Sequence, residues 1–155
     1  MPIYDLLGGA YQQNLRLYAN GWDRGRGPSA AYGDAVAKNV ADGFGAFKFD
    51  PFKINGSGEA VHPRRILTKE TAALARERVT TAREAAPDAD IILEFHGNLW
   101  PTDASRFGAA AAAIDPYFYE EVVDPLNVSA TAEVARLTGV PLAGGERLFS
   151  RSGFR

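Results

Sequence analysis

The sequence of 155 residues contains no cysteine, and this absence excludes several kinds of site. Without thiols, the chain can form no disulfides, zinc–thiolate sites or iron–sulfur clusters, and it has no cysteine nucleophile. It also contains no run of about 18 apolar residues, the length that a membrane-spanning helix requires. Its glycines form no GxGxxG or P-loop motif for phosphate binding.

Neither sign of charge dominates the sequence. Lysine and arginine total 17, aspartate and glutamate total 19, and the net charge is −2 with histidine neutral. This balance gives no electrostatic basis for binding nucleic acid. The first residues, from Met1 to Asp5, lack the basic start and apolar centre of a signal peptide. We therefore expect a cytoplasmic protein that binds neither nucleic acid nor membranes.

The composition is that of a globular domain. Hydrophobic residues make up 46% and charged residues 23% of the sequence, so the chain has enough apolar side chains to bury a core. No stretch of linker composition divides residues 1–155, and we expect them to form a single domain. A closed (β/α)8 barrel needs roughly 200 residues or more, so this chain cannot close one alone.

Short apolar runs alternate with amphipathic stretches along the chain. We expect strands at residues 15–19, 46–49, 91–96, 117–120 and 141–146. Helices are expected at residues 30–42, 69–86, 103–114 and 128–138, with Ser29, Thr68 and Asn127 as N-caps. This alternation is typical of a parallel sheet, either doubly wound or part of a barrel. The irregular stretch 51–67, with a surface His62, is expected to be a loop after a strand.

Three glutamates, Glu94, Glu120 and Glu146, stand at the ends of consecutive expected strands and are separated by equal intervals. Because parallel strands end at one edge of their sheet, we expect the three carboxylates to lie at the same level. Unpaired burial of like charges would raise their pKa values or destabilise the fold. A divalent cation removes this problem, and hard oxygen ligands in this number suit Mg²⁺. The alternative is that each glutamate is a solvated strand end or an ion-pair partner.

Other polar side chains share this face by the two-residue alternation of a strand. Lys48 and Asp50 point to the side opposite Phe47 and Phe49, which we expect to pack under the helices. His96 follows the first glutamate by two residues, and beside a metal it can serve as a general acid or base. Lys48 can hold an anionic substrate, act as a base or neutralise the glutamates. Asp50 either faces the site or caps the turn that follows it.

Four segments resemble motifs of the mandelate racemase and muconate-lactonising branch of the enolase superfamily. They are Lys48-Phe49-Asp50-Pro51-Phe52, Glu94-Phe95-His96-Gly97, Tyr119-Glu120-Glu121 and Gly145-Glu146-Arg147. The first resembles the second barrel strand of this branch, and the other three resemble its metal-ligand motifs. Within the branch, the sequence is most similar to sugar-acid dehydratases of the galactonate dehydratase type.

The resemblance implies an α/β fold, an incomplete TIM (β/α)8 barrel of about the first five parallel βα units. Residues 1–155 would then be part of the C-terminal barrel domain, without the N-terminal capping domain and the last strands. In the family, those last strands carry the base that removes the α-proton. We therefore expect the isolated chain to be inactive, and the full-length parent to be a homo-oligomer.

The resemblance also implies the chemistry of the parent enzyme. Glu94, Glu120 and Glu146 would bind Mg²⁺, while Lys48 and Asp50 would contact a small sugar-acid substrate. The reaction would be a β-elimination of water from a 2-hydroxy sugar acid (an aldonate) through an enediolate. His96 would protonate the departing 3-hydroxyl.

The sequence departs from the family pattern at several positions. Asn98 stands where the family has an arginine, and Val122 stands in place of a proline. Lys48-x-Asp50 replaces the Lys-x-Lys of the racemases, which favours a dehydratase. Three alternatives stay open: a non-catalytic half-barrel that binds a divalent cation or a sugar acid, a racemase or epimerase of the same superfamily, and an unrelated doubly wound binding protein.

Overall fold

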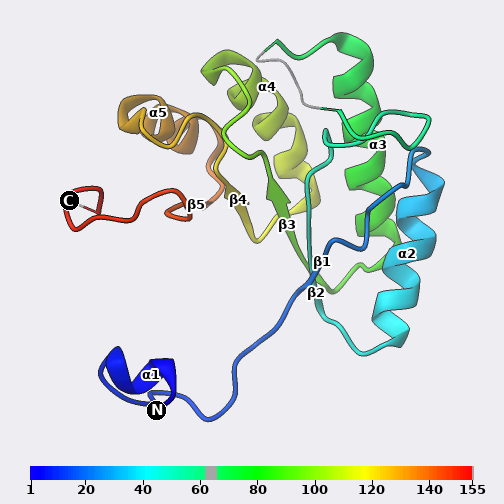
Figure 1. Cartoon of the computed structure of the whole chain (residues 1–155). Helices are drawn as coiled ribbons and strands as arrows, with labels where there is room; N and C mark the ends of the chain where they lie inside the picture. The colour runs from blue at the N-terminus through cyan, green and yellow to red at the C-terminus, as the bar shows by residue number, and fades with distance from the viewer. Residues whose placement is uncertain (62–65, 155) are drawn as a thin grey trace.

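The computed structural model describes residues 1–61 and 66–154 (Figure 1). His62, which we expect at the surface, lies outside the described residues. The helices and strands, in chain order, are α1 (Ile3–Leu6), β1 (Ala19–Asn20), α2 (Ala30–Ala41), β2 (Ala46–Phe49), α3 (Lys69–Ala85), β3 (Asp90–Glu94), α4 (Pro101–Ala111), the 3₁₀ helix η1 (Ala112–Ile114), β4 (Phe118–Glu120), α5 (Val128–Thr138) and β5 (Leu142–Ala143). None of the helices within the described part of the chain is both long and apolar enough to cross a membrane.

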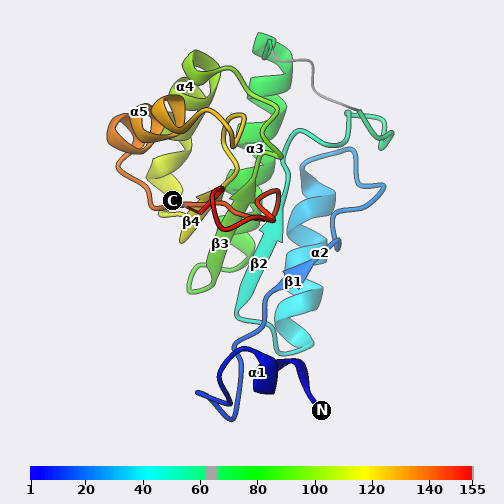
Figure 2. The same cartoon turned by 60° about the vertical axis from the view of Figure 1, so that its left-hand side comes forward.

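The five strands form one parallel sheet in the order β1-β2-β3-β4-β5. A doubly wound sheet reverses its strand order at a switch point, whereas this order follows the sequence without a reversal. Helices α2 to α5 pack against one another in sequence along one side of the sheet (Figure 2). The prediction of five parallel βα units of a barrel is therefore confirmed, and the doubly wound alternative is wrong.

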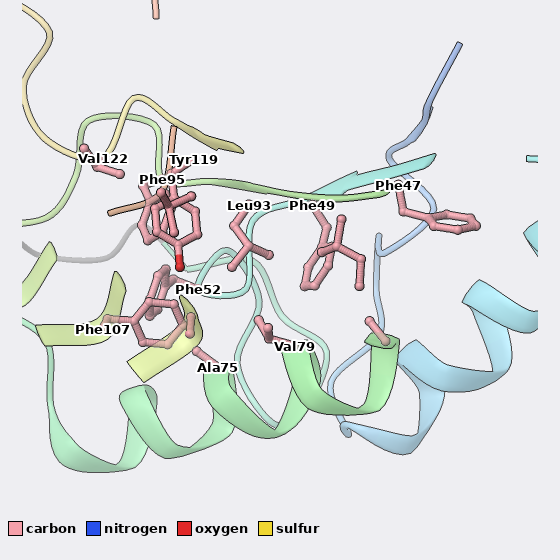
Figure 3. Close-up of a cluster of buried hydrophobic side chains, with 14 of the residues drawn as sticks. Phe47, Phe49, Phe52, Ala75, Val79, Leu93, Phe95, Phe107, Tyr119 and Val122 are labelled. Carbon is pink, nitrogen blue, oxygen red and sulfur yellow. The ribbon is translucent and has the colours of Figure 1, made fainter. Parts of the chain in front are cut away.

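An aromatic core fills the space between the sheet and the helices (Figure 3). Phe47 and Phe49 of β2 are fully buried there, as their alternation with Lys48 predicts. Further along the sheet, the rings of Phe52 and Phe107 meet edge to face at 4.7 Å between centroids. Each buried aromatic side chain stabilises the fold by about 1.5–3 kcal/mol. This core attaches the helices to one face and leaves the opposite face for polar side chains.

Two of the three predicted N-caps are confirmed. The Thr68 hydroxyl accepts a hydrogen bond from the Thr71 amide at 3.1 Å, and the Asn127 side chain accepts one from the Ala130 amide at 3.0 Å. Ser29 does not cap α2, because its own backbone is already helical. Its hydroxyl donates instead to the carboxylate of Glu77 at 3.1 Å, a partner on α3 that local sequence does not reveal.

Four strands are shorter than the sequence predicts, and β4 differs least, since it begins at Phe118 instead of at residue 117. β1 begins at Ala19, and Leu15 and Leu17 before it are exposed. β3 ends at Glu94, because His96 adopts a left-handed backbone with φ 50° that ends the extended run. β5 ends at Ala143, so Glu146 lies in the loop that follows. Two of the predicted site residues are therefore presented by loops rather than by strands.

Arg78 of α3 is buried in the core, which its position on the helix did not lead us to expect. Its Nη1 donates hydrogen bonds to the carbonyls of Pro51 at 2.8 Å and Ile54 at 2.6 Å. Its Nη2 donates to the carbonyls of Asn55 and Gly27. The first three acceptors belong to the β2–α3 loop and Gly27 belongs to the β1–α2 loop, so one side chain joins both loops.

The same two loops also touch through glycines. A Cβ added at Gly27 would lie 2.2 Å from the carbonyl oxygen of Gly56. A Cβ on Gly58, which has a φ of +88°, would lie 2.8 Å from the carbonyl oxygen of Gly25. Only residues without a side chain allow the two backbones to come this close. The β1–α2 loop and residues 51–58 of the β2–α3 loop are therefore packed against each other.

We predict that Arg78→Met destabilises the protein by about 3 kcal/mol or more, because it leaves several buried carbonyls without their donor. Urea unfolding of the two proteins measures this difference. Arg76→Met, at an exposed position on the same helix, is the matched control and should change stability by less than about 0.5 kcal/mol. Equal stability of the two variants would contradict the role given to Arg78.

Candidate metal centre

The three glutamates predicted from their spacing lie together in the structure. Glu94 is the last residue of β3, and the strand register pairs it directly with Glu120, the last residue of β4. Glu146 reaches the same place from the loop after β5. One carboxylate oxygen of each residue lies within 4.8 Å of the other two. Glu94 is buried, Glu120 is half-buried and Glu146 is exposed, so the group is open on one side.

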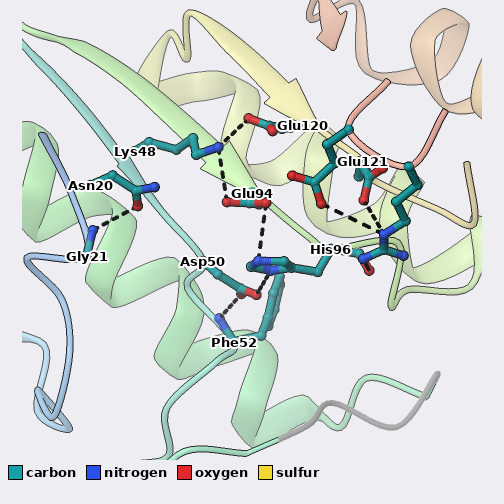
Figure 4. A network of polar contacts seen from close by, with 11 residues as sticks. Asn20, Gly21, Lys48, Asp50, Phe52, Glu94, His96, Glu120 and Glu121 are labelled. Atoms are coloured by element: carbon teal, nitrogen blue, oxygen red, sulfur yellow. Dashed lines mark hydrogen bonds and ion pairs between the residues drawn. The ribbon is translucent and has the colours of Figure 1, made fainter. Parts of the chain in front are cut away.

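Lys48 lies between the two more buried carboxylates (Figure 4). Its Nζ is 2.7 Å from Oε2 of Glu120 and 3.3 Å from Oε2 of Glu94. Burial pulls the pKa of Lys48 down, but its hydrogen bond to Glu120 and the charges of both glutamates raise this pKa above its usual value. Lys48 is thus an ammonium ion that neutralises the glutamates, one of the alternatives that its sequence position left open.

Lys48 alone cannot balance three carboxylates. Arg147 lies 3.8 Å from Glu146 but closer to a further carboxylate, Glu121, at 3.1 Å, so the site keeps an excess of negative charge. Buried like charges are costly unless they are paired with cations. The donor set consists of hard carboxylate oxygens, with one side open for water and a further ligand. Such a set suits Mg²⁺, which keeps several waters and binds a few carboxylates. The residues present therefore fit a hard divalent cation.

Asp50 holds His96 beside Glu94, one of the three glutamates. Nδ1 of His96 is 2.8 Å from Oδ2 of Asp50, and Nε2 of His96 is 3.2 Å from Oε1 of Glu94. The other oxygen of Asp50 accepts a hydrogen bond from the Phe52 amide at 2.8 Å. Asp50 thus does both things that its sequence position allowed: it caps the turn and it faces the site.

The charge on His96 is favoured by its neighbours. Its hydrogen bond to Asp50 raises the pKa of His96 most strongly, burial opposes this, and the charges of Asp50 and Glu94 raise it further. A histidine with a raised pKa is a proton donor over a wider range of pH. The imidazole is therefore oriented by one carboxylate, lies against a candidate metal ligand, and carries a proton that it can donate.

Glu121 and Arg147 are part of the site, although their positions in the sequence predicted no role for them. Arg147 Nε is 3.1 Å from Glu121 Oε2 and 3.8 Å from Glu146 Oε1. Its Nη2 donates to the carbonyl of His96 at 2.9 Å. Burial raises the pKa of Glu121, and the charge of Arg147 opposes this. The only sequence signal was that each residue directly follows a predicted metal ligand.

The backbone is strained at two positions of the site. His96 and Glu121 both have positive φ angles, 50° and 44°, in a region that residues other than glycine rarely adopt. The Gly97 amide donates to the Glu121 carbonyl at 2.6 Å and so holds the two loops together. Such strain persists only where the surrounding structure enforces it, and it is concentrated at functional sites.

Comparison with known proteins identifies relatives over nearly the whole chain. Residues 31–155 match the family described as "Enolase C-terminal domain-like". The D-gluconate dehydratase of Thermoproteus tenax is 33% identical over 150 residues, which are 96% of this chain and 29% of that protein. The D-galactonate dehydratase of Xanthomonas euvesicatoria pv. vesicatoria is 31% identical over 156 residues, with 100% of this chain and 38% of that protein covered.

Solved structures agree with this grouping. A member of the enolase superfamily from Salmonella Typhimurium superimposes with a TM-score of 0.89 and 32% identity, covering 99% of this chain and 42% of that chain. A mandelate racemase/muconate lactonizing enzyme from Jannaschia sp. CCS1 superimposes with a TM-score of 0.80 and 28% identity, covering 99% and 41%. The chain spans less than half the length of each of these relatives. From its sequence and its fold, the chain belongs to the C-terminal barrel-domain family of the mandelate racemase and muconate-lactonising branch of the enolase superfamily.

Proposed function

We propose that this chain is part of a Mg²⁺-dependent sugar-acid dehydratase and supplies its metal ligands and its general acid. The observation that carries this proposal is the convergence of Glu94, Glu120 and Glu146, each with one carboxylate oxygen within 4.8 Å of the others. The proximity of His96 and Asp50 supports it. The relatives named above act on D-gluconate and D-galactonate, so we infer an aldonate as the substrate.

The three glutamates would hold the Mg²⁺ ion. When bound, this ion supplies positive charge for the carboxylate of the substrate and for the charge that develops when the α-proton is removed. Lys48 stays beside Glu94 and Glu120 as a fixed second cation and keeps these two side chains in place. Because Lys48 is held as an ammonium ion, we assign it no role as a base, and this favours a dehydratase over a lysine-dependent racemase.

His96 would act as the general acid of the elimination. Breaking the C3–O bond requires a proton on the departing oxygen, so that water rather than hydroxide leaves. The Nε2 of His96 faces the metal ligands and can donate this proton, while Nδ1 donates to Asp50 and keeps the ring in place. We assign to this chain the metal ligands, the acid and the residue that orients the acid.

We predict that Mg²⁺ raises the melting temperature of the protein, because a cation that binds only the folded state stabilises it by mass action. At a concentration 100-fold above its dissociation constant, the expected rise is about 5–10 °C. In Glu120→Gln, which removes one ligand charge, the Mg²⁺-dependent rise should be lost.

The control for this measurement is Glu133→Gln, which removes an exposed carboxylate on α5. It should keep the full Mg²⁺-dependent rise. Because the quantity compared is the rise within each variant, a change in basal stability does not affect the result. The same Mg²⁺ response in Glu120→Gln as in the unmodified protein would refute the metal site.

We predict that the pKa of His96 lies above its ordinary value of 6.5 and falls in Asp50→Asn, because Asp50 is the main cause of the increase. A raised pKa in the folded state gives stability that is fully present below the pKa of the unfolded chain. This stability is lost as the pH rises through the pKa of the folded protein. NMR titration of the imidazole in the metal-free protein measures the shift.

The control for the titration is Asp42→Asn, because Asp42 is exposed and pairs with Lys38 at the far end of α2. It should leave the titration of His96 unchanged. A His96 pKa at or below 6.5 in the unmodified protein would contradict the proposed ion pair with Asp50.

We predict that the 155-residue chain alone, with Mg²⁺ present, forms no 2-keto-3-deoxy acid from D-gluconate or D-galactonate. Dehydration also needs a base for the α-proton. Lys48, Asp50, Glu94 and Glu120 are already engaged with His96 or with one another. Glu146 is assigned to the metal ion, and its carboxylate lies 3.8 Å from Arg147. A colorimetric assay for the keto acid tests this, and measurable turnover would overturn our assignment of roles.

A further inference from the structure

A polar cleft opens next to the candidate metal centre, on the side of His96 that faces β1 and β2. Its volume is about 160 Å³, and His96 and Glu94 form one end of it. It is also lined by Asn20 at the end of β1, by Asp23 and Arg24 of the β1–α2 loop and by Lys53 of the β2–α3 loop. We call this space the Asp23 cleft.

The position of the Asp23 cleft follows from the strand order. The metal-ligand candidates come from β3, from β4 and from the loop after β5, whereas the other residues of the cleft come from the end of β1 and from the loops after β1 and β2. His96, which follows β3, lies between the metal-ligand candidates and these residues of the cleft. A substrate bound at the metal through its carboxylate, with its 3-hydroxyl at His96, therefore directs its remaining carbons toward the Asp23 cleft.

The wall of the cleft is formed before any ligand binds. Arg78 bonds to the carbonyl of Gly27 in one loop and to those of Pro51, Ile54 and Asn55 in the other. The contact of Gly27 with the Gly56 backbone adds a second link. A site held in its binding conformation costs little further ordering when a ligand enters.

Asp23 is the residue of the cleft that most directly indicates a ligand. It is only 5% exposed, and within the described part of the chain it forms no ion pair with Arg24 or Lys53. Burial raises the pKa of Asp23, while its own backbone amide and the more distant charges of Lys53 and Arg24 lower it. A buried carboxylate that lines a cleft without a paired cation is costly to the fold, and a ligand with hydroxyl donors reduces that cost.

The mixture of groups indicates the chemistry of the ligand. Asp23 accepts hydrogen bonds, Arg24 and Lys53 donate them, and the Asn20 amide does both. A hydroxyl group also donates and accepts, so a chain of hydroxylated carbons can satisfy all four side chains, whereas an apolar chain satisfies none. The cleft holds on the order of five waters by volume, which is room for a short polyol segment.

We propose that the Asp23 cleft is the subsite for the hydroxylated carbons of the sugar acid beyond C3. Asp23 accepts hydrogen bonds from their hydroxyl groups, and Arg24 and Lys53 donate to them. These residues then decide that a long aldonate is preferred over a short 2-hydroxy acid. The inference rests on the proposed function, because it takes the metal and His96 as the anchors of the substrate.

The test compares two acids that differ only in the distal carbons. The isotope-labelled 155-residue protein with saturating Mg²⁺ is titrated by NMR with D-gluconate and with glycolate, a 2-hydroxy acid without further carbons. We expect Asp23→Asn to weaken D-gluconate binding by about tenfold or more, the loss of one charged hydrogen bond, and to leave glycolate binding unchanged. Asp34→Asn, at an exposed position on α2, is the control and should bind both acids as the unmodified protein does.

Lys53→Gln is a second variant, at an exposed position where folding is not at risk. It should also weaken D-gluconate binding and spare glycolate. Unchanged D-gluconate affinity in both variants, with Mg²⁺ and glycolate still bound, would overturn the subsite and leave the proposed function intact. Failure of the unmodified protein to bind either acid with Mg²⁺ present would overturn both.

Discussion

Side-chain alternation along strands that pair in sequence order is the constraint on which both the core and the site depend. In β2, Phe47 and Phe49 face the helices while Lys48 faces the opposite side. The parallel register then sets Glu94 directly beside Glu120. A shift by one residue would send the aromatic rings into the polar site and the charges into the core. Packing energy therefore fixes the positions of the charged groups.

The same alignment collects like charges, and the surrounding residues compensate for them. Lys48 is placed between two glutamates, and His96 is placed between Glu94 and Asp50. These cations reduce the repulsion without removing it, because three carboxylates still share one open space. A divalent cation would complete the neutralisation of such a site. The charge balance thus connects the stability of the fold with its proposed chemistry.

The loops around the site are held in place by two arginines. Arg78 joins the β1–α2 and β2–α3 loops through backbone carbonyls. Arg147 does the same on the other side, where it bonds to the carbonyl of His96 and pairs with Glu121. The strained backbones of His96 and Glu121 are supported by these contacts. Two arginines therefore hold in place, through hydrogen bonds and an ion pair, the loops that surround the candidate metal centre and the Asp23 cleft.

Local patterns in the sequence determined the strand-helix alternation, the N-caps at Thr68 and Asn127, and the equal spacing of the three glutamates. These features have a period, or lie within a few residues of one another, so they can be recognised without a structure. Tertiary structure alone decided that Arg78 is buried and that Asp23 lines a cleft. Such features arise from contacts between residues far apart in the chain, which leave no local pattern to recognise.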